Sequence, residues 1–101
     1  MSVTVEKTGK KALTFTFSGQ VSRIADQATV ASDEHTRIPK GAQVSVTFGR
    51  DIVADSTLVG MVSALAERVK RRHGSWGTVE GIEFLSTPQV RDPISTILAA
   101  N

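Results

Sequence analysis

Apolar and polar residues alternate along three segments of the chain, and this alternation predicts three β-strands. The apolar positions that share a face are Val3 and Val5, then Leu13, Phe15 and Phe17, and then Val44, Val46 and Phe48. The first two segments are separated by a short polar stretch over 7–11 that is typical of a turn, so they predict a β-hairpin. The third segment predicts a strand over 42–48.

The spacing of apolar residues changes after residue 57, which predicts a helix. The residues that fall on one helical face are Leu58, Met61, Val62, Leu65 and Val69. Gly74 ends this helix. A sparser pattern of Ile24, Ala28 and Ala31 predicts a helix over 22–34.

The last quarter of the chain predicts one more strand and one more helix. Residues 79–85 have the composition of a strand. Thr87 and Pro88 then provide an N-cap and a first-turn proline for a helix, in which Ile94, Ile97 and Leu98 face the core. Asp92-Pro93 repeats this cap-and-proline pattern, so the helix is either kinked or restarted there.

Strands that alternate with helices predict an α/β fold with right-handed crossovers. We expect a mixed β-sheet of about four strands, antiparallel in the N-terminal hairpin and parallel elsewhere, with about three helices. No repeat or linker divides the chain, so residues 1–101 form a single domain. The predicted core consists of Leu13, Phe15, Phe17, Val44, Val46, Phe48, Met61, Val62, Leu65, Ile82 and Phe84.

Composition supports a folded intracellular protein. The chain has 101 residues, 40% hydrophobic and 22% charged, with a net charge of +2. Its lack of cysteine excludes disulfides, thiolate catalysis and cysteine-ligated zinc. No stretch approaches the roughly 18 consecutive apolar residues of a membrane span, and the N-terminus lacks the apolar core of a signal peptide. We therefore expect a cytoplasmic protein.

Residue patterns typical of catalysis are absent from the sequence. The two histidines, His35 and His73, have no further histidine or cysteine at metal-ligand spacing. Neither a nucleophile elbow nor a glycine-rich phosphate loop occurs. We expect neither an enzyme nor a bound metal or cofactor.

Basic residues gather near the end of the predicted long helix. Arg68, Lys70, Arg71 and Arg72 either complement the helix dipole as solvated side chains or bind an acidic partner or nucleic acid. The only nearby aromatic residue is Trp76, which we place in a loop. Few aromatics for base stacking and a small net charge make nucleic acid the weaker alternative.

The start of the same helix carries the most informative polar residues, Asp55, Ser56 and Thr57. Asp55 or Ser56 is suited to capping the free N–H groups of the first turn. The same position also favours added negative charge, so a phosphorylated Ser56 is compatible with it. Local physics favours the capping role alone.

Four segments together resemble a STAS domain, the fold of bacterial anti-sigma factor antagonists. Residues 13–21 (LTFTFSGQV) resemble the second strand and its terminal glycine, and residues 44–48 (VSVTF) resemble the central strand. Residues 55–62 (DSTLVGMV) resemble the D-S-[ST]-G-L-G-x-L segment, with Leu58 in place of its glycine. Residues 82–91 (IEFLSTPQVR) resemble the last strand and the start of the final helix. The resemblance covers almost the whole chain.

The resemblance implies a transcription regulator that acts by protein–protein interaction. In the family, the serine after the aspartate is phosphorylated by a partner serine kinase that is itself an anti-sigma factor. By position this serine is Ser56, and Asp55, Thr57 and Leu58 would join it in contacting the partner. Phosphorylation would break the contact, and no cofactor on this chain is implied.

Two other functions are alternatives to a phosphorylation switch. In the first, the chain is a non-switching STAS subunit of a lipid-transport or stress-sensing assembly, and Ser56 is only a helix cap. In the second, it is a nucleic-acid-binding module that uses the basic cluster.

Overall fold

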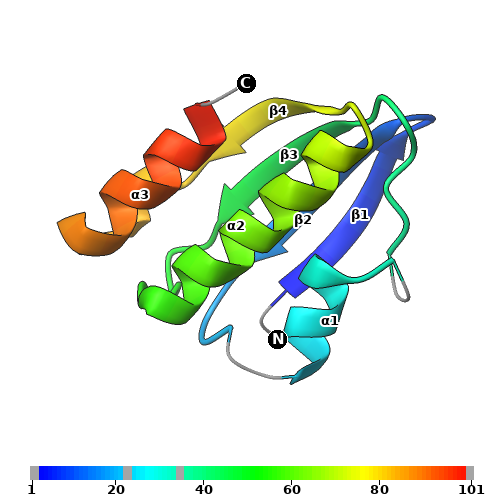
Figure 1. Ribbon diagram of the computed structural model, residues 1–101. Helices are drawn as coiled ribbons and strands as arrows, with labels where there is room; N and C mark the ends of the chain where they lie inside the picture. The colour runs from blue at the N-terminus through cyan, green and yellow to red at the C-terminus, as the bar shows by residue number, and fades with distance from the viewer. Residues whose placement is uncertain (1–2, 22–23, 34–35, 100–101) are drawn as a thin grey trace.

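A computed structural model describes residues 3–21, 24–33 and 36–99, and within these residues the chain forms four strands, three α-helices and one short 3-10 helix (Figure 1). The predicted α/β class is confirmed. In chain order the elements are β1 (Val3–Gly9), β2 (Ala12–Phe17), α1 (Ile24–Ala31), β3 (Gln43–Phe48), α2 (Ser56–Arg71), β4 (Ser75–Glu80), η1 (Ile82–Phe84) and α3 (Pro88–Ala99).

The four strands form one mixed sheet in the order β1-β2-β3-β4. β1 and β2 are antiparallel, as expected of the hairpin, whereas β2, β3 and β4 are mutually parallel. Phe15 lies opposite Val5 on one side and Val46 on the other, so the apolar positions of three strands fall in one row. Because side chains alternate along a strand, this register puts the apolar residues of the three strands on the same face of the sheet.

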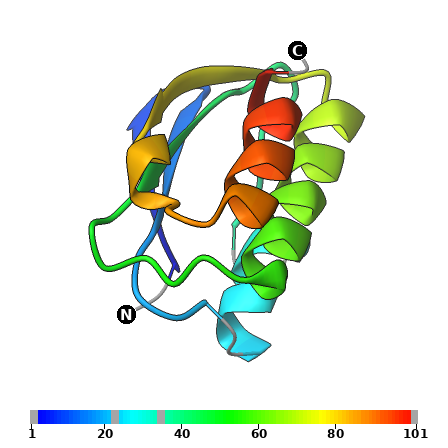
Figure 2. The ribbon, with the colours of Figure 1, turned by 90° about the vertical axis from the view of Figure 1, so that its left-hand side faces the viewer.

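All three α-helices cover one face of the sheet, and α2 lies between α1 and α3 (Figures 1 and 2). The opposite face carries partly exposed polar side chains such as Thr14, Thr16, Ser45 and Thr47. A sheet with one apolar and one solvated face shows this alternation. The protein is therefore a two-layer α/β structure whose core lies between the helices and the sheet.

The core contains nine of the eleven residues predicted for it, from β2, β3 and α2. Phe15, Phe17, Val44, Val46, Leu58, Val62 and Leu65 are essentially inaccessible to solvent. The rings of Phe17 and Phe48 stack with their centroids 5.6 Å apart. The prediction was wrong for Ile82 and Phe84, which are only partly buried and pack against the edge of the core.

These two residues differ from the prediction because the last strand lies earlier in the chain than residues 79–85. β4 ends at Glu80, since Gly81 adopts a left-handed conformation with φ of 83°. A Cβ at Gly81 would lie 2.0 Å from the carbonyl oxygen of Phe48, so only glycine fits there. The chain then enters η1. β4 also includes Trp76, which is consequently a strand residue and not the loop residue that we predicted.

The two helices with the less regular sequence patterns are both present, but they differ in part from the prediction. α1 occupies Ile24–Ala31, but among residues 25–31 the buried ones are Asp26 and Val30, and Ala31 is exposed, contrary to the predicted face. The side chain of Ile24 lies outside the described residues. The expected start of this helix at Ser22 and its end at Glu34 lie outside the described residues. α3 is continuous from Pro88 to Ala99 with Pro93 inside it, so the helix does not restart.

The end of α2 is closed by backbone hydrogen bonds that direct the chain into β4. His73 N–H donates to Lys70 O and Gly74 N–H donates to Val69 O, the pattern of a Schellman motif. The left-handed residue is His73, with φ of 54°, and not the glycine that follows it. A Cβ at Gly74 would lie 2.7 Å from Ala42 O, so Gly74 allows β4 to start against the beginning of β3.

Arg68 joins α1 to α2 through a buried guanidinium group. Its side chain is 5% exposed, although we predicted a solvated residue. Nη1 donates to Thr29 O at 3.1 Å and Val30 O at 2.8 Å, and Nη2 donates to Asp33 Oδ1 at 2.7 Å and to Thr36 O. The carbonyls of Thr29 and Val30 belong to the last turn of α1, which has no intrahelical partners for them. We call Arg68, Asp33 and the carbonyls of Thr29, Val30 and Thr36 the Arg68 clamp.

Replacing Arg68 with methionine should destabilise the protein by about 2–4 kcal/mol, because three carbonyls and a carboxylate lose a charged donor. Arg71→Met is the matched control: it removes an exposed cation from the same helical turn and should change stability by less than about 0.5 kcal/mol. Urea unfolding followed by circular dichroism measures both. Equal effects of the two variants would contradict the structural role of Arg68.

The clamp should also make stability sensitive to acid. The hydrogen bond from Arg68 lowers the pKa of Asp33 below its ordinary value of 3.8, and the positive charges of Arg68, Arg72 and Arg37 act in the same direction. A carboxyl with a lowered folded-state pKa stabilises the protein above the unfolded-state pKa and loses this contribution as the pH falls through the folded-state pKa.

We therefore expect the difference in unfolding free energy between the unmodified protein and Asp33→Asn to be constant near neutral pH. It should shrink once the pH drops below 3.8. Urea titrations at a series of pH values measure this difference. A difference that persists unchanged at pH 2 would show that the carboxylate charge contributes nothing.

Candidate functional site

The loop that leads from β3 to α2 is fixed to the end of β2. Gly49 N–H donates to Phe17 O at 2.8 Å, and Val53 N–H donates to Gly19 O at 2.9 Å. A Cβ at Gly49 would lie 3.2 Å from the Cβ of Ser18, so a small residue is favoured at this close approach. The loop therefore delivers Asp55 to a defined place beside the carboxyl ends of the parallel strands, where ligands of α/β proteins commonly bind.

Asp55 is the N-cap of α2. Its backbone is extended, with φ of −134° and ψ of 179°, and its Oδ1 accepts a hydrogen bond from Leu58 N–H at 3.1 Å. An aspartate in this geometry satisfies one of the free N–H groups of the first turn and places negative charge at the positive end of the helix dipole. Of the two capping candidates, the structure assigns the role to Asp55.

Ser56 is the first residue of α2 and is exposed, and Thr57 beside it is partly buried. No hydrogen bond of the Ser56 hydroxyl is recorded among the residues that the structure describes. Because Asp55 carries the cap, the hydroxyl of Ser56 is not needed to start the helix.

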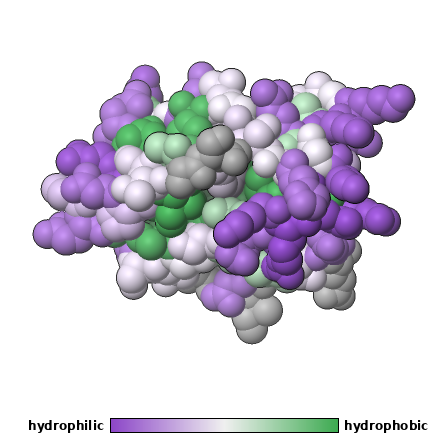
Figure 3. Space-filling view, turned by 45° about the horizontal axis from the view of Figure 1, so that its top comes forward, coloured by the Kyte–Doolittle hydropathy of each residue, from purple (hydrophilic) through white to green (hydrophobic). Residues whose placement is uncertain are grey.

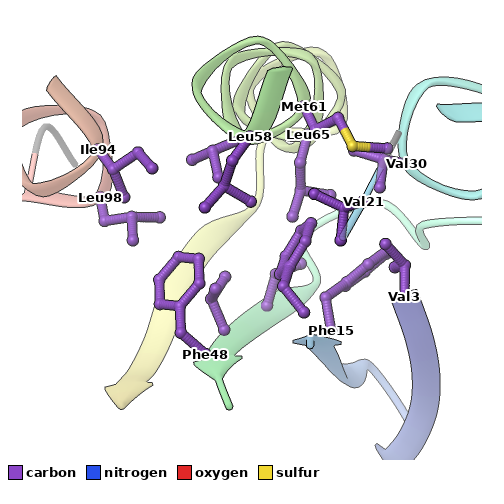
Figure 4. Close-up of a cluster of buried hydrophobic side chains, with 14 of the residues drawn as sticks. Val3, Phe15, Val21, Val30, Phe48, Leu58, Met61, Leu65, Ile94 and Leu98 are labelled. Atoms are coloured by element: carbon purple, nitrogen blue, oxygen red, sulfur yellow. The ribbon is translucent and has the colours of Figure 1, made fainter. Parts of the chain in front are cut away.

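Leu58 does not belong to this surface. We predicted that it contacts a partner, but its side chain is completely buried and points from α2 toward the sheet (Figure 4). Its bulk fills the core instead of projecting beside Ser56. The surface part of the predicted contact therefore consists of Asp55, Ser56 and Thr57.

A groove between α1 and α2 adjoins this surface. It has a volume of about 330 Å³, and its lining includes Val30, Ala31, Thr57, Gly60 and Met61. Gly60 is exposed, and a Cβ built on it would meet no atom within 4 Å. Sequence reasoning missed this groove because its two walls come from helices that are about 30 residues apart in the chain.

The basic cluster is divided between two pockets: Arg68, Arg71 and Arg72 line one together with Asp33, and Lys70 lines another. Arg68 is buried in the clamp, and Arg72 Nη2 lies 4.0 Å from Asp33 Oδ2. Lys70 and Arg71 remain exposed. The four residues therefore do not present a common face to a nucleic-acid backbone.

Neither a cluster of metal-ligating residues nor a membrane-spanning helix occurs in the part of the chain that is described. His73 is exposed and His35 lies outside the described residues. In the described ranges, no three residues among His, Cys, Asp and Glu gather in a way that could hold a metal ion. Nor does any helix in those ranges have both the length and the apolar character that crossing a membrane requires.

Comparison with known proteins adds no relative: no protein-family model, curated protein or solved structure matches the chain. The geometry at the start of α2 is therefore the basis for a functional assignment.

The assignment of the cap to Asp55 predicts how the first turn responds to substitution. Asp55→Ala should destabilise the protein by about 1 kcal/mol, whereas Asp55→Ser should retain most of the stability. Ser56→Ala is the control, and its effect should stay below about 0.5 kcal/mol because it loses no capping bond. Thermal unfolding compares the three variants. A larger loss for Ser56→Ala than for Asp55→Ala would move the cap to Ser56.

Proposed function

We propose that this protein is a regulatory domain that binds a protein partner and is switched by phosphorylation of Ser56. The observation that carries the proposal is the division of roles at the start of α2. Asp55 caps the helix, and Ser56 stays exposed at its first position. The resemblance to STAS domains favours the same serine. The partner that it implies is a serine kinase that acts as an anti-sigma factor.

A phosphate on Ser56 is compatible with the folded helix. It would lie at the positive end of the helix dipole, near N–H groups of the first turn, of which only that of Leu58 is bonded to the Asp55 side chain. Phosphorylation should therefore leave α2 intact. The switch would act on the contact with the partner and not by unfolding this domain.

The same phosphate would oppose a partner that packs against the helix start. It adds about −1.5 to −2 charge units next to the carboxylate of Asp55. Bringing this charge into an interface is unfavourable because of desolvation and repulsion from any acidic group of the partner. The proposed contact surface consists of Asp55, Ser56 and Thr57, continued by the groove beside Gly60.

Incubation with an anti-sigma serine kinase and ATP tests the phosphorylation site. Intact mass should increase by one phosphate in the unmodified protein and in Ser63→Ala, which removes another exposed serine of α2. Ser56→Ala should gain none. Phosphate that is still incorporated into Ser56→Ala would remove Ser56 from the proposal.

The same kinase, in its nucleotide-bound form, tests the contact surface. Phosphorylated protein should bind it at least about tenfold more weakly than unphosphorylated protein, as expected from placing a dianion in an interface. Gly60→Gln, which fills the groove, should also weaken binding, whereas Gly60→Ala should bind normally and be more stable by up to about 1 kcal/mol. Equal binding by phosphorylated and unphosphorylated protein would favour the non-switching alternative.

A further inference from the structure

A second groove lies at the opposite end of α2, between α2, α3 and the start of β4. Its volume is about 580 Å³. Its apolar lining includes Val69, Trp76 and Ile97, and its polar lining includes Glu67, Lys70 and His73. In Figure 3, which brings this end of the molecule forward, green apolar surface lies next to a dense group of purple hydrophilic side chains. None of these residues belongs to the surface around Ser56.

One wall of this groove is the partly exposed side chain of Trp76. It pairs with Val44 in the sheet register and so belongs to the row that faces the helices. It is nevertheless only partly buried, whereas Val44 is completely buried. A large amphipathic ring of this kind gains from contact with an apolar group, and tryptophan is among the most frequent anchors of protein interfaces.

The charged residues of the groove are arranged by sign along α2. Lys70 and His73 line the groove and are exposed toward the end of α2, whereas Arg71 lines a different pocket. Glu67 lies almost one helical turn before Lys70 and carries the charge opposite to that of Lys70. None of Glu67, Lys70 and Arg71 takes part in an ion pair within the described part of the chain. A ligand that fits this order has an acidic group near Lys70 and His73 and none near Glu67.

We infer that this groove binds an acidic peptide segment of a protein partner, with an apolar anchor side chain against Trp76 and Ile97 and carboxylates beside Lys70 and His73. Glu67 disfavours a uniform polyanion such as nucleic acid, because its carboxylate would lie within the path of the phosphates. The apolar walls of Val69 and Ile97 favour an aliphatic or aromatic anchor. This inference does not depend on phosphorylation of Ser56.

Trp76 is the only tryptophan of the chain, so its fluorescence reports on the groove directly. The probe is a capped peptide in which one leucine is followed by a run of aspartates. Its controls carry lysines in place of the aspartates, or serine in place of the leucine. The leucine–aspartate peptide should shift the emission of Trp76 to saturation, and both control peptides should bind at least about tenfold more weakly.

Three substitutions of charged residues test the orientation of the peptide. Lys70→Gln should weaken binding by about threefold and Glu67→Gln should strengthen it by about threefold, the scale of an exposed ion pair. Arg50→Gln is the control: it makes the same change in net charge as Lys70→Gln, but at the opposite end of the sheet, and should leave the affinity unchanged.

Several outcomes would overturn the inference. These are no saturable change in the emission, equal binding of the lysine peptide, or an effect of Arg50→Gln as large as that of Lys70→Gln. Tighter binding of an oligothymidylate than of the peptide would identify the ligand as nucleic acid. Self-association that Lys70→Gln abolishes would identify a second copy of this chain as the occupant.

Discussion

The guanidinium group of Arg68 is the interaction on which the arrangement of the helical layer depends. α1 has only eight residues and no basic residue in its last turn, so it is too short to be stable alone and does not complete its own C-terminus. Arg68 supplies donors from α2 to the carbonyls of Thr29 and Val30, which precede it by 39 and 38 residues. It also holds Asp33 and Thr36, where the chain leaves the helix. Because the guanidinium is buried, its bond to Val30 O is protected from competing water, whereas Asp33 reaches the guanidinium from the surface. The position of α1, and hence one wall of the groove beside Gly60, follows from this contact.

Both ends of α2 have backbone groups without partners inside the helix, and different residues satisfy them at each end. At the start, Asp55 accepts from the backbone and complements the positive end of the dipole. At the end, the Schellman bonds of His73 and Gly74 take up the last carbonyls. Asp55 both caps α2 and belongs to the proposed contact surface, whereas the side chains of Ser56 at one end and Lys70 at the other take no part in these caps. Substitutions of Ser56 and Lys70 should therefore leave the fold intact, so that the roles of these two residues in binding can be measured separately from stability.

The sequence was sufficient to predict β1, β2, β3 and α2, because these elements depend on local periodicity. The alternation in Leu13, Phe15 and Phe17, and the helical spacing from Leu58 to Val69, each repeat over several residues and bury one face. The end of β4 could not be predicted from periodicity, since it depends on the approach of Gly81 to the backbone of Phe48. The partners of Arg68 are equally non-local. One signal was present, however: Arg68 lies three residues after Leu65 and seven after Met61, on the buried face of the helix. At the candidate site the sequence correctly predicted the N-terminus of a helix. The choice between Asp55 and Ser56 as its N-cap, however, required the backbone geometry of Asp55.

The length of α2 separates the two proposed binding surfaces. Its 16 residues span about 24 Å at a rise of 1.5 Å per residue. Charges in solution are screened over about 8–10 Å at physiological ionic strength, so a phosphate on Ser56 has little direct electrostatic effect on Lys70 or His73. Communication between the surfaces would require α2 to move relative to the sheet or to α1. The buried stripe of Leu58, Met61, Val62 and Leu65, which packs on the core, and the Arg68 clamp, which joins α2 to α1, oppose such movement. The two surfaces are therefore expected to act independently, so that one partner could be released by phosphorylation while a second remains bound.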